Sequence, residues 1–166
     1  MANIYLDNNP TKTIGNLPKI GEKAKDFKLI GKDLSEVTLN NFKGRKLVLN
    51  IFPAIDTGIC SSSVKKFNTK AAQFSNISVL CISKDLPFAQ NRFCGSEGID
   101  NVITLSDFTS GKFGEDYELT IVDGPFANLL SRCVIVLDEA HNVIYTEQVS
   151  DIASEPNYEE ALAALK

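Results

Sequence analysis

The chain has 166 residues, of which 43% are hydrophobic and 23% charged, and its formal net charge is −4. This length allows a sizeable core, and the negative charge argues against nucleic-acid binding, which needs a basic stripe. No apolar run approaches the roughly 18 residues of a membrane span, and no secretory signal precedes the first predicted elements. We therefore expect one domain, residues 1–166, in the cytoplasm, with no nucleic-acid or membrane partner.

The first 25 residues are rich in turn-forming residue types. Ile4–Leu6 and Lys12–Ile14 flank the sequence Asn8-Asn9-Pro10, whose composition is typical of a turn. We expect these two segments to pair as a β-hairpin. This hairpin forms an N-terminal extension, residues 1–25, of the main domain.

The next segments predict strands and then a helix. Short strands are expected at Asp26–Ile30 and Val37–Leu39. The segment Lys46–Phe52 is almost continuously apolar, which is typical of a strand covered on both faces, and Pro53 ends it. A helix should begin near Gly58, because apolar residues then recur at helical spacing. These residues are Val64, Phe67, Ala71 and Phe74.

The second half of the chain alternates strands and helices in the same way. A buried strand at Asn76–Ser83 precedes a short helix from Asp85, its N-cap, to Cys94, with Gly95 as its stop signal. The later elements are a strand at Asn101–Leu105, a helix at Ser110–Tyr117, a hairpin of Arg132–Leu137 with Asn142–Thr146, and a helix from Asn157. This order predicts an α/β, thioredoxin-like fold with a mixed central sheet flanked by helices.

Cys60 is the candidate reactive residue. The crossover after Lys46–Phe52 delivers it to the carboxyl end of that strand, where open α/β sheets place their sites. In the first turn of a helix, free amides and the helix dipole favour a thiolate. Lowering the pKa of a free thiol from ~8.5 to ~6 raises its thiolate fraction at pH 7 only about thirtyfold. Position alone leaves a buried structural cysteine as an equal alternative, and fast chemistry also needs aimed donors such as the Thr57 hydroxyl.

The other titratable candidates favour structural roles. Cys81 and Cys133 lie mid-strand among aliphatic residues, so we expect them to pack in the core. The only histidine, His141, falls in a predicted hairpin turn, where we expect solvent exposure. This position argues against a Cys–His hydrolase and against a metal site. No glycine-rich phosphate loop is present either, so we expect no metal, flavin or nucleotide cofactor.

The segment around Cys60 resembles the active-site motif of the peroxiredoxins, Pro-x-x-x-Thr-x-x-Cys. Pro53, Thr57 and Cys60 occupy the motif positions without a gap. The resemblance is to the bacterial thiol peroxidases in particular, an atypical two-cysteine peroxiredoxin subfamily, and it covers nearly the whole chain. The supporting segments are Asn50–Cys60, Ser63–Asn68, Lys32–Ser35, Ser83–Gln90 and Asp123–Pro125.

The resemblance implies a role for each matched residue. Cys60 would attack the peroxide and become a sulfenic acid, Thr57 would hydrogen-bond the thiolate and the peroxide, and Pro53 would shield the sulfenate from water. Arg132 matches the arginine that enters the site from a later strand. Cys94 matches the resolving cysteine, which would form a disulfide with Cys60. Because a disulfide needs Cα atoms within about 7 Å, we expect both helix ends to unwind as it forms.

The resemblance also implies substrates and partners. It implies hydroperoxides, especially alkyl and lipid-like ones, as substrates, thioredoxin as the reductant and a homodimer as the assembly. An apolar collar suited to such substrates is expected from Ile55, Ile59, Phe126, Leu129 and Leu130. The alternative function is a redox-sensing or disulfide-exchange module without peroxidase turnover. A thioredoxin-type reductase is disfavoured, because Thr57 stands where Cys-x-x-Cys has its first cysteine.

Overall fold

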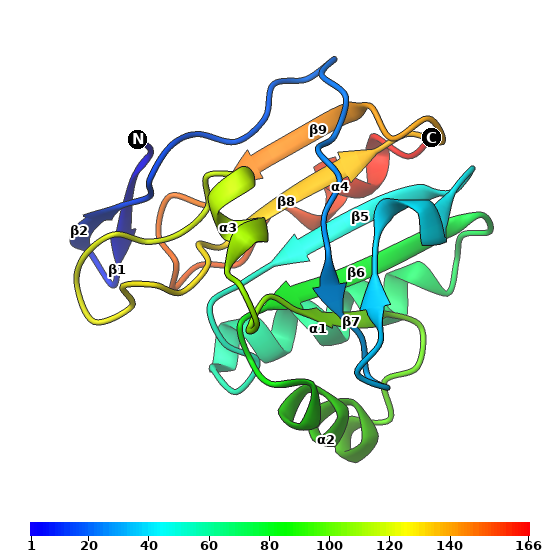
Figure 1. Ribbon diagram of the computed structural model, residues 1–166, viewed down its shortest axis with the longest axis horizontal. Coiled ribbons are helices and arrows are strands. Elements are labelled where there is room, and N and C mark those ends of the chain that lie inside the picture. The colour runs from blue at the N-terminus through cyan, green and yellow to red at the C-terminus, as the bar shows by residue number, and fades with distance from the viewer.

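The computed structural model describes residues 1–166, and Figure 1 shows a central sheet with helices on both faces. No helix combines the length and the apolar character that crossing a membrane requires. The elements are β1 (Asn3–Leu6), β2 (Asn9–Lys12), β3 (Leu29–Ile30), β4 (Glu36–Val37), a 3-10 helix η1 (Leu39–Phe42), β5 (Lys46–Ile51), α1 (Gly58–Ala71), β6 (Ile77–Ser83), α2 (Pro87–Glu97), β7 (Ile103–Ser106), α3 (Lys112–Asp116), β8 (Cys133–Leu137), β9 (Val143–Gln148) and α4 (Tyr158–Ala163).

The main sheet is mixed, as the order of predicted elements indicated. Its seven strands lie in the order β4-β3-β7-β6-β5-β8-β9. The central strand β5 pairs in parallel with β6, and β6 pairs in parallel with β7, whereas β8 is antiparallel to both β5 and β9. Helix α1 is the crossover between β5 and β6. The thioredoxin-like arrangement predicted from the sequence is therefore confirmed.

The two faces of β5 explain its continuous apolar sequence. Leu47, Leu49 and Ile51 point into one core cluster, which also contains residues of α3 and of the segment before β4. Val48 points into a second cluster on the opposite face, under α1 and α4. In Figure 1 these two helices lie behind the sheet and α3 lies in front. Both faces of the strand are covered, so polar residues are nearly excluded from it.

The N-terminal hairpin is present, with its turn shifted from the predicted place. Strands β1 and β2 pair antiparallel, and their turn consists of Asp7 and Asn8, with φ angles of 51° and 68°. Asn and Asp tolerate this left-handed region, which two-residue hairpin turns require. Pro10 lies within β2 instead of in the turn, because an edge strand tolerates a residue without an amide hydrogen.

Two short strands are briefer than expected because a side chain takes over their backbone bonding. Asp26 Oδ1 accepts hydrogen bonds from the amides of Phe27 (2.8 Å) and Leu39 (3.1 Å). These bonds leave only Leu29–Ile30 to pair as β3, and the segment after Val37 turns into η1.

The end of α2 differs from the prediction. Gly95 lies inside the helix, and the helix ends at Gly98, whose φ of 65° is left-handed. Asp85 is not the N-cap, since Leu86 occupies that position and makes no side-chain capping bond. The carboxylate of Asp85 points instead toward the loop before α1.

The prediction of a solvated His141 was wrong. Its side chain is buried, and its Nε2 lies 3.0 Å from the carbonyl oxygen of Phe42. The residue has a φ of 63° in the β8–β9 turn, and this left-handed conformation accompanies a side chain turned inward. Tertiary contact with the last residue of η1 therefore overrides the polarity of the turn.

We predict opposite effects of alanine at the two glycines of α2. A Cβ at either position meets no atom within 4 Å, so the backbone conformation alone decides the result. Gly95→Ala should stabilise the protein by about 0.5–1 kcal/mol, because glycine is a poor helix former. Gly98→Ala should destabilise it by about 1 kcal/mol, because alanine resists positive φ. Urea denaturation measures both changes, and equal effects would contradict the helix end described above.

Candidate active site

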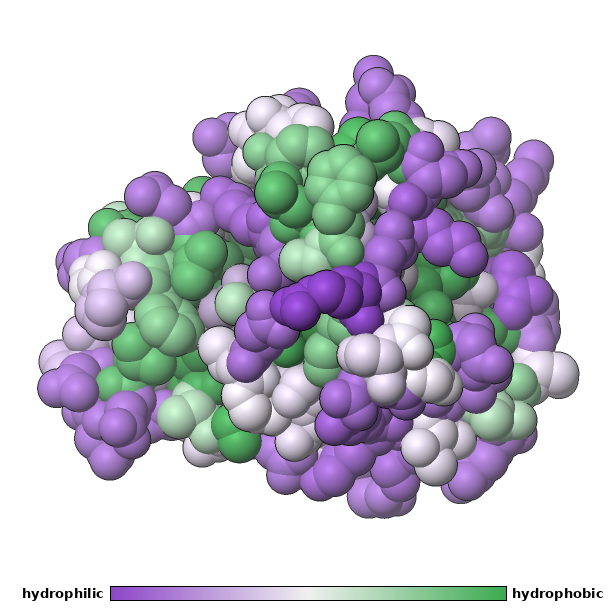
Figure 2. All heavy atoms as spheres, turned by 90° about the horizontal axis from the view of Figure 1, so that it is seen from below, coloured by the Kyte–Doolittle hydropathy of each residue, from purple (hydrophilic) through white to green (hydrophobic).

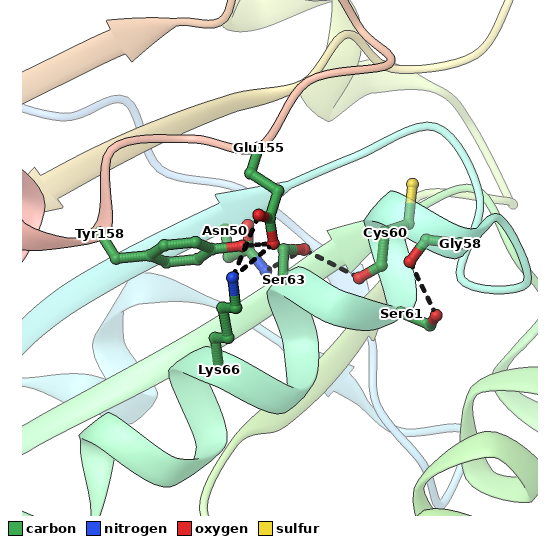
Figure 3. Close-up of polar contacts among 8 residues, drawn as sticks. All are labelled: Asn50, Gly58, Cys60, Ser61, Ser63, Lys66, Glu155 and Tyr158. Carbon is green, nitrogen blue, oxygen red and sulfur yellow. Dashed lines mark hydrogen bonds and ion pairs between the residues drawn. The ribbon is translucent and has the colours of Figure 1, made fainter.

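Cys60 lies in the first turn of α1, just beyond the carboxyl end of β5. Thr57 is the N-cap, and its hydroxyl oxygen accepts a hydrogen bond from the Cys60 amide at 3.4 Å. The Cys60 side chain is completely buried. Figure 3 shows its sulfur turned away from the following turn of the helix. The sulfur therefore occupies a water-poor place near the free amides of a helix start.

Arg132 brings a positive charge to this sulfur. It precedes β8, and the pairing of Ile51 with Cys133 places it across from the end of β5. Its Nη2 lies 3.1 Å from Cys60 Sγ, and its Nε donates a 2.7 Å hydrogen bond to the carbonyl of Ile152. The structure thus brings together Cys60, a residue of the sequence motif, and Arg132, which the wider family resemblance matched.

The guanidinium is buried with one donor unused. Only 2% of Arg132 is exposed, and its Nη1 has no hydrogen-bond partner. A buried charge is costly unless an anion compensates it, and an unpaired buried donor is costly as well. A thiolate at Cys60 would compensate the positive charge of the guanidinium. An oxygen atom of a molecule bound beside the sulfur would accept a hydrogen bond from the unpaired Nη1.

A polar cluster of Lys66, Glu155 and Tyr158 flanks this centre (Figure 3). Lys66 Nζ lies 2.9 Å and 3.0 Å from the two carboxylate oxygens of Glu155, and the Tyr158 hydroxyl lies 3.2 Å from one of them. The hydrogen bond from Lys66, with a smaller contribution from the charge of Arg132, lowers the pKa of Glu155. Glu155 is therefore ionised at neutral pH and is committed to Lys66 rather than to the guanidinium.

Thr57 and Pro53 lie in the loop between β5 and α1. The Thr57 hydroxyl donates to the carbonyl of Ala54 at 3.1 Å while it accepts from the Cys60 amide. Its hydrogen therefore points away from the sulfur, and the hydroxyl must rotate to donate to a bound molecule. Pro53 is buried and follows the last residue of β5, Ile51, after Phe52. Both residues thus belong to the loop that sets the position of Cys60.

Asp85 anchors that loop, a role that the sequence reading missed. Its Oδ2 accepts hydrogen bonds from the Ile55 amide (2.7 Å) and from the Ser83 hydroxyl (2.6 Å). Asp85 lies between β6 and α2, so one carboxylate connects the loop before Cys60 to the start of the helix that carries Cys94. A signal was present in the sequence, because Asp85 follows a buried strand at the carboxyl edge of the sheet.

Asn50 and Ser63 form a second missed feature, a buried polar pair beneath the first turn of α1 (Figure 3). Asn50 Nδ2 donates to Ser63 Oγ at 3.3 Å and lies 3.7 Å from Cys81 Sγ. Ser63 Oγ in turn donates to the Cys60 carbonyl at 2.8 Å. Asn50 is the one polar residue among the buried positions of β5, and this was the available signal in the sequence. This pair ties β5 to the helix turn that carries Cys60.

The two mid-strand cysteines are core residues, as predicted. Cys81 and Cys133 are fully buried, and each lies in an apolar cluster. Burial raises the pKa of Cys81 to about 12, against a smaller opposing effect of the Asn50 hydrogen bond. Burial likewise raises the pKa of Cys133. Both are therefore neutral thiols in the folded protein at physiological pH.

Cys94 is half-buried on α2, and no disulfide is present. It packs against the same cluster that contains Cys60, beside a surface groove of about 560 Å³. Burial raises the pKa of the Cys94 thiol, and the nearby charge of Lys32 opposes this effect. Its carbonyl accepts the amides of Gly98 and Ile99, so the backbone of Cys94 takes part in the helix end.

The expected apolar collar is smaller than predicted. Ile55 and Leu130 are fully buried and belong to the core. Ile59, Phe126 and Leu129 are partly exposed. Figure 2 shows hydrophobic residues gathering on the side of the molecule that carries the N-terminal hairpin. Part of the collar therefore remains accessible to a ligand or to another protein.

Comparisons with known proteins agree with the fold. Residues 19–162 match the family model described as Redoxin. The chain is 52% identical over 165 residues to a thiol peroxidase of Corynebacterium glutamicum and to one of Mycobacterium bovis, covering 99% of this chain and of each relative. It superposes on the crystal structure of a peroxiredoxin-like protein from Aquifex aeolicus with a TM-score of 0.92 and 35% identity, covering 98% of this chain and 95% of that one.

We predict that Arg132 controls the nucleophilicity of Cys60. Arg132→Met keeps much of the side-chain volume but removes the positive charge beside the sulfur. Alkylation of Cys60 by iodoacetamide at pH 7 should slow at least tenfold, because the sulfur loses the positive charge that lies beside it. Arg45→Met is the matched control, because Arg45 also binds a carbonyl but lies at Ile77 and Ser78. Equal alkylation profiles in all three proteins would contradict the prediction.

Proposed function

The chain belongs to the Redoxin family, and on that basis we propose that it is a thiol-dependent peroxidase whose Cys60 reduces hydroperoxides. The observation that carries this proposal is the 3.1 Å contact between Arg132 Nη2 and Cys60 Sγ in a buried site. The second observation is that Arg132 Nη1 has no partner, so a donor is available beside the sulfur. A hydroperoxide supplies the oxygen atoms that such a site lacks.

The proposed oxidation step is a nucleophilic substitution at oxygen. The Cys60 thiolate attacks the distal peroxide oxygen, an S–O bond forms, and the O–O bond breaks. Sulfur loses two electrons and becomes a sulfenic acid, while the leaving oxygen takes a proton and departs as an alcohol or as water. Negative charge moves onto the leaving oxygen, and an oriented donor at such a position contributes about 3 kcal/mol, or about a hundredfold in rate. We assign this contribution to Nη1 of Arg132.

Thr57 and Pro53 complete the proposed site. After rotation about its Cβ–Oγ1 bond, the Thr57 hydroxyl is free to donate to the peroxide instead of to Ala54. Pro53 has no amide hydrogen, so the loop presents an apolar surface to the nascent sulfenate. Exclusion of water at this point protects the sulfenate and strengthens the electrostatic effect of Arg132.

We propose that Cys94 resolves the sulfenic acid. Its thiol attacks the sulfenic sulfur, an S–S bond forms, and water leaves. The first turn of α1 and the end of α2 must loosen in this step, because a disulfide needs Cα atoms within about 7 Å and burial now keeps Cys60 enclosed. A dithiol reductant of the thioredoxin type then reduces the disulfide and restores both thiols.

We predict different kinetic consequences for the two cysteines. Cys60→Ser should abolish dithiol-dependent consumption of cumene hydroperoxide, because the nucleophile is lost. Cys94→Ser should still consume one equivalent per chain and then stop, with sulfenic acid trapped at Cys60. Stopped-flow assays and mass spectrometry after dimedone labelling measure these outcomes, with Cys133→Ser as the buried-cysteine control.

Persistent turnover by Cys60→Ser would refute the peroxidase proposal. Stoichiometric oxidation of wild type without turnover, despite added thioredoxin and its reductase, would favour a redox-sensing or disulfide-exchange module instead. Trapping of the sulfenic acid in wild type as readily as in Cys94→Ser would refute the resolving role.

We also propose that the protein is a homodimer. Leu86, Phe88 and Phe108 are 50%, 64% and 41% exposed, and they lie close to the Asp85–Ser106 hydrogen bond at the carboxyl edge of the sheet. Exposed large apolar residues that gather near a functional edge mark an interaction surface. Burial of this surface against a second copy would also cover the approach to the site.

We predict that Phe88→Glu dissociates this dimer. A charge at the centre of the apolar surface has no partner in the interface, and its desolvation opposes association. Ile20→Glu is the matched control, because Ile20 is equally exposed at 66% but lies in the segment after the hairpin. Sedimentation velocity should show a monomer only for Phe88→Glu. A dimer that survives in Phe88→Glu would contradict this choice of interface.

Substrate preference, compartment and domain organisation complete the proposal. Alkyl and lipid-like hydroperoxides fit the partly exposed Ile59, Phe126 and Leu129.

Free cysteines and a thioredoxin-type reductant suit a reducing compartment, and we propose the cytoplasm. We propose one domain over residues 1–166, with residues 1–25 as an extension, because backbone hydrogen bonds such as Ile14 to Thr120 tie the extension to the main part.

A further inference from the structure

The orientation of Arg132 depends on one carbonyl group. Of the three guanidinium nitrogens, Nη2 contacts Cys60 Sγ, Nη1 has no partner, and Nε donates to the carbonyl of Ile152. Ile152 lies between β9 and α4 in a segment without regular secondary structure. No strand or helix bonding therefore fixes this carbonyl, and its position must be set by other contacts.

The N-terminal hairpin supplies those contacts through its first strand. The Tyr5 amide donates to the Ser150 carbonyl at 2.7 Å, and the Ile152 amide donates to the Tyr5 carbonyl at 2.8 Å. These two bonds form an isolated parallel bridge around Asp151. The Ile152 side chain is buried in a small cluster with Ile4 and Ile121. The hairpin thus holds Ile152 by its backbone and by its side chain.

Asp151 fastens the turn of the hairpin to the same segment. Its carboxylate accepts hydrogen bonds from the amides of Asp7 (3.1 Å), Asn8 (3.0 Å) and Ala153 (2.9 Å). Asp7 and Asn8 are the two turn residues with positive φ, a conformation that directs successive amides toward one anion. The hydrogen bonds from Ala153 and Asn8 hold the pKa of Asp151 below its usual range, so the carboxylate stays charged.

We propose that Asp151 is a positioning residue for the peroxidase reaction: it clamps the hairpin turn onto the segment that carries the Ile152 carbonyl, and this carbonyl holds Arg132 against Cys60. The inference rests on the proposed function of Cys60 and Arg132. In this arrangement the N-terminal hairpin affects the reaction through Ile152 and Arg132, although it contributes no atom to the site. Without the clamp, the charge of Arg132 stays near Cys60, but the guanidinium is no longer held in one orientation.

The direct test is Asp151→Ala in the full-length protein. Oxidation of Cys60 by cumene hydroperoxide, followed by stopped flow, should slow between tenfold and a hundredfold, which is the size expected for a misplaced catalytic donor. Iodoacetamide alkylation of Cys60 at pH 7 should slow less than this oxidation, because the charge of Arg132 stays beside the sulfur while the direction of its donors is lost. Reduction of the Cys60–Cys94 disulfide by thioredoxin should be unchanged, because Arg132 acts only in the oxidation step. Asp151→Asn, which keeps one acceptor oxygen, should give an intermediate oxidation rate.

Thr11→Val is the matched control for loosening of the hairpin. The Thr11 hydroxyl ties the other strand of the hairpin to the carbonyl and carboxylate of Asp123, and it makes no hydrogen bond to Asp151 or Ile152. This variant should oxidise Cys60 within twofold of the wild-type rate. Equal losses in Thr11→Val and Asp151→Ala would overturn the proposal, since the hairpin would then matter only for general stability.

The remaining outcomes separate this inference from the proposed function. Wild-type oxidation rates in Asp151→Ala, together with an inactive Cys60→Ser, would overturn the clamp while leaving the peroxidase intact. If Asp151→Ala does not fold, Asp151→Asn carries the test through ¹⁵N NMR of the Arg132 Nε–H group. Faster hydrogen exchange at this group supports the clamp, and unchanged exchange overturns it.

Discussion

The contact between Arg132 and Cys60 is the interaction on which the rest of the site depends. A guanidinium that is 2% exposed costs several kcal/mol in desolvation unless an anion lies beside it, and the sulfur at 3.1 Å is the group in contact. The antiparallel pairing of β5 with β8 makes this contact possible, because it places Arg132 across from the end of β5. The pairing of the strands thus places a buried positive charge in contact with the Cys60 sulfur.

The packing that supports this contact also opposes the second half of the proposed cycle. Cys60 is fully buried and Cys94 is half-buried, so the proposed disulfide needs movement of the helices that carry them. The end of α2 suits such movement, since it rests on the left-handed Gly98 and is mostly exposed. Asp85 adds a connection, because it holds the loop before Cys60 at the start of the same helix. The Asp85 carboxylate therefore connects the loop before Cys60, which is held in place, to α2, the helix that must move in the proposed disulfide step.

The sequence predicted correctly the elements that have a clear hydrophobic pattern. It misplaced element ends where one residue type is compatible with two different structures. The continuous apolar run predicted β5, because this strand is buried on both faces. The helical spacing of apolar residues predicted α1, because this helix is buried on one face. The hairpin turn was displaced because Asn9 and Pro10 resemble turn residues yet tolerate an edge strand. The end of α2 was displaced because Gly95 is compatible with a helix interior, and residue type alone does not reveal φ.

By itself, the sequence determined the helix turn that holds Thr57 and Cys60. Thr57 and Cys60 are three residues apart, and a helix start places such a pair in one turn whatever the rest of the chain does. Only the tertiary structure decided that Ile152 orients Arg132 and that Asp151 joins this segment to the hairpin turn. These contacts connect residues that are distant along the chain. Hydrophobic periodicity and capping signals describe neighbours on one element, whereas the meeting of distant residues depends on how whole elements pack.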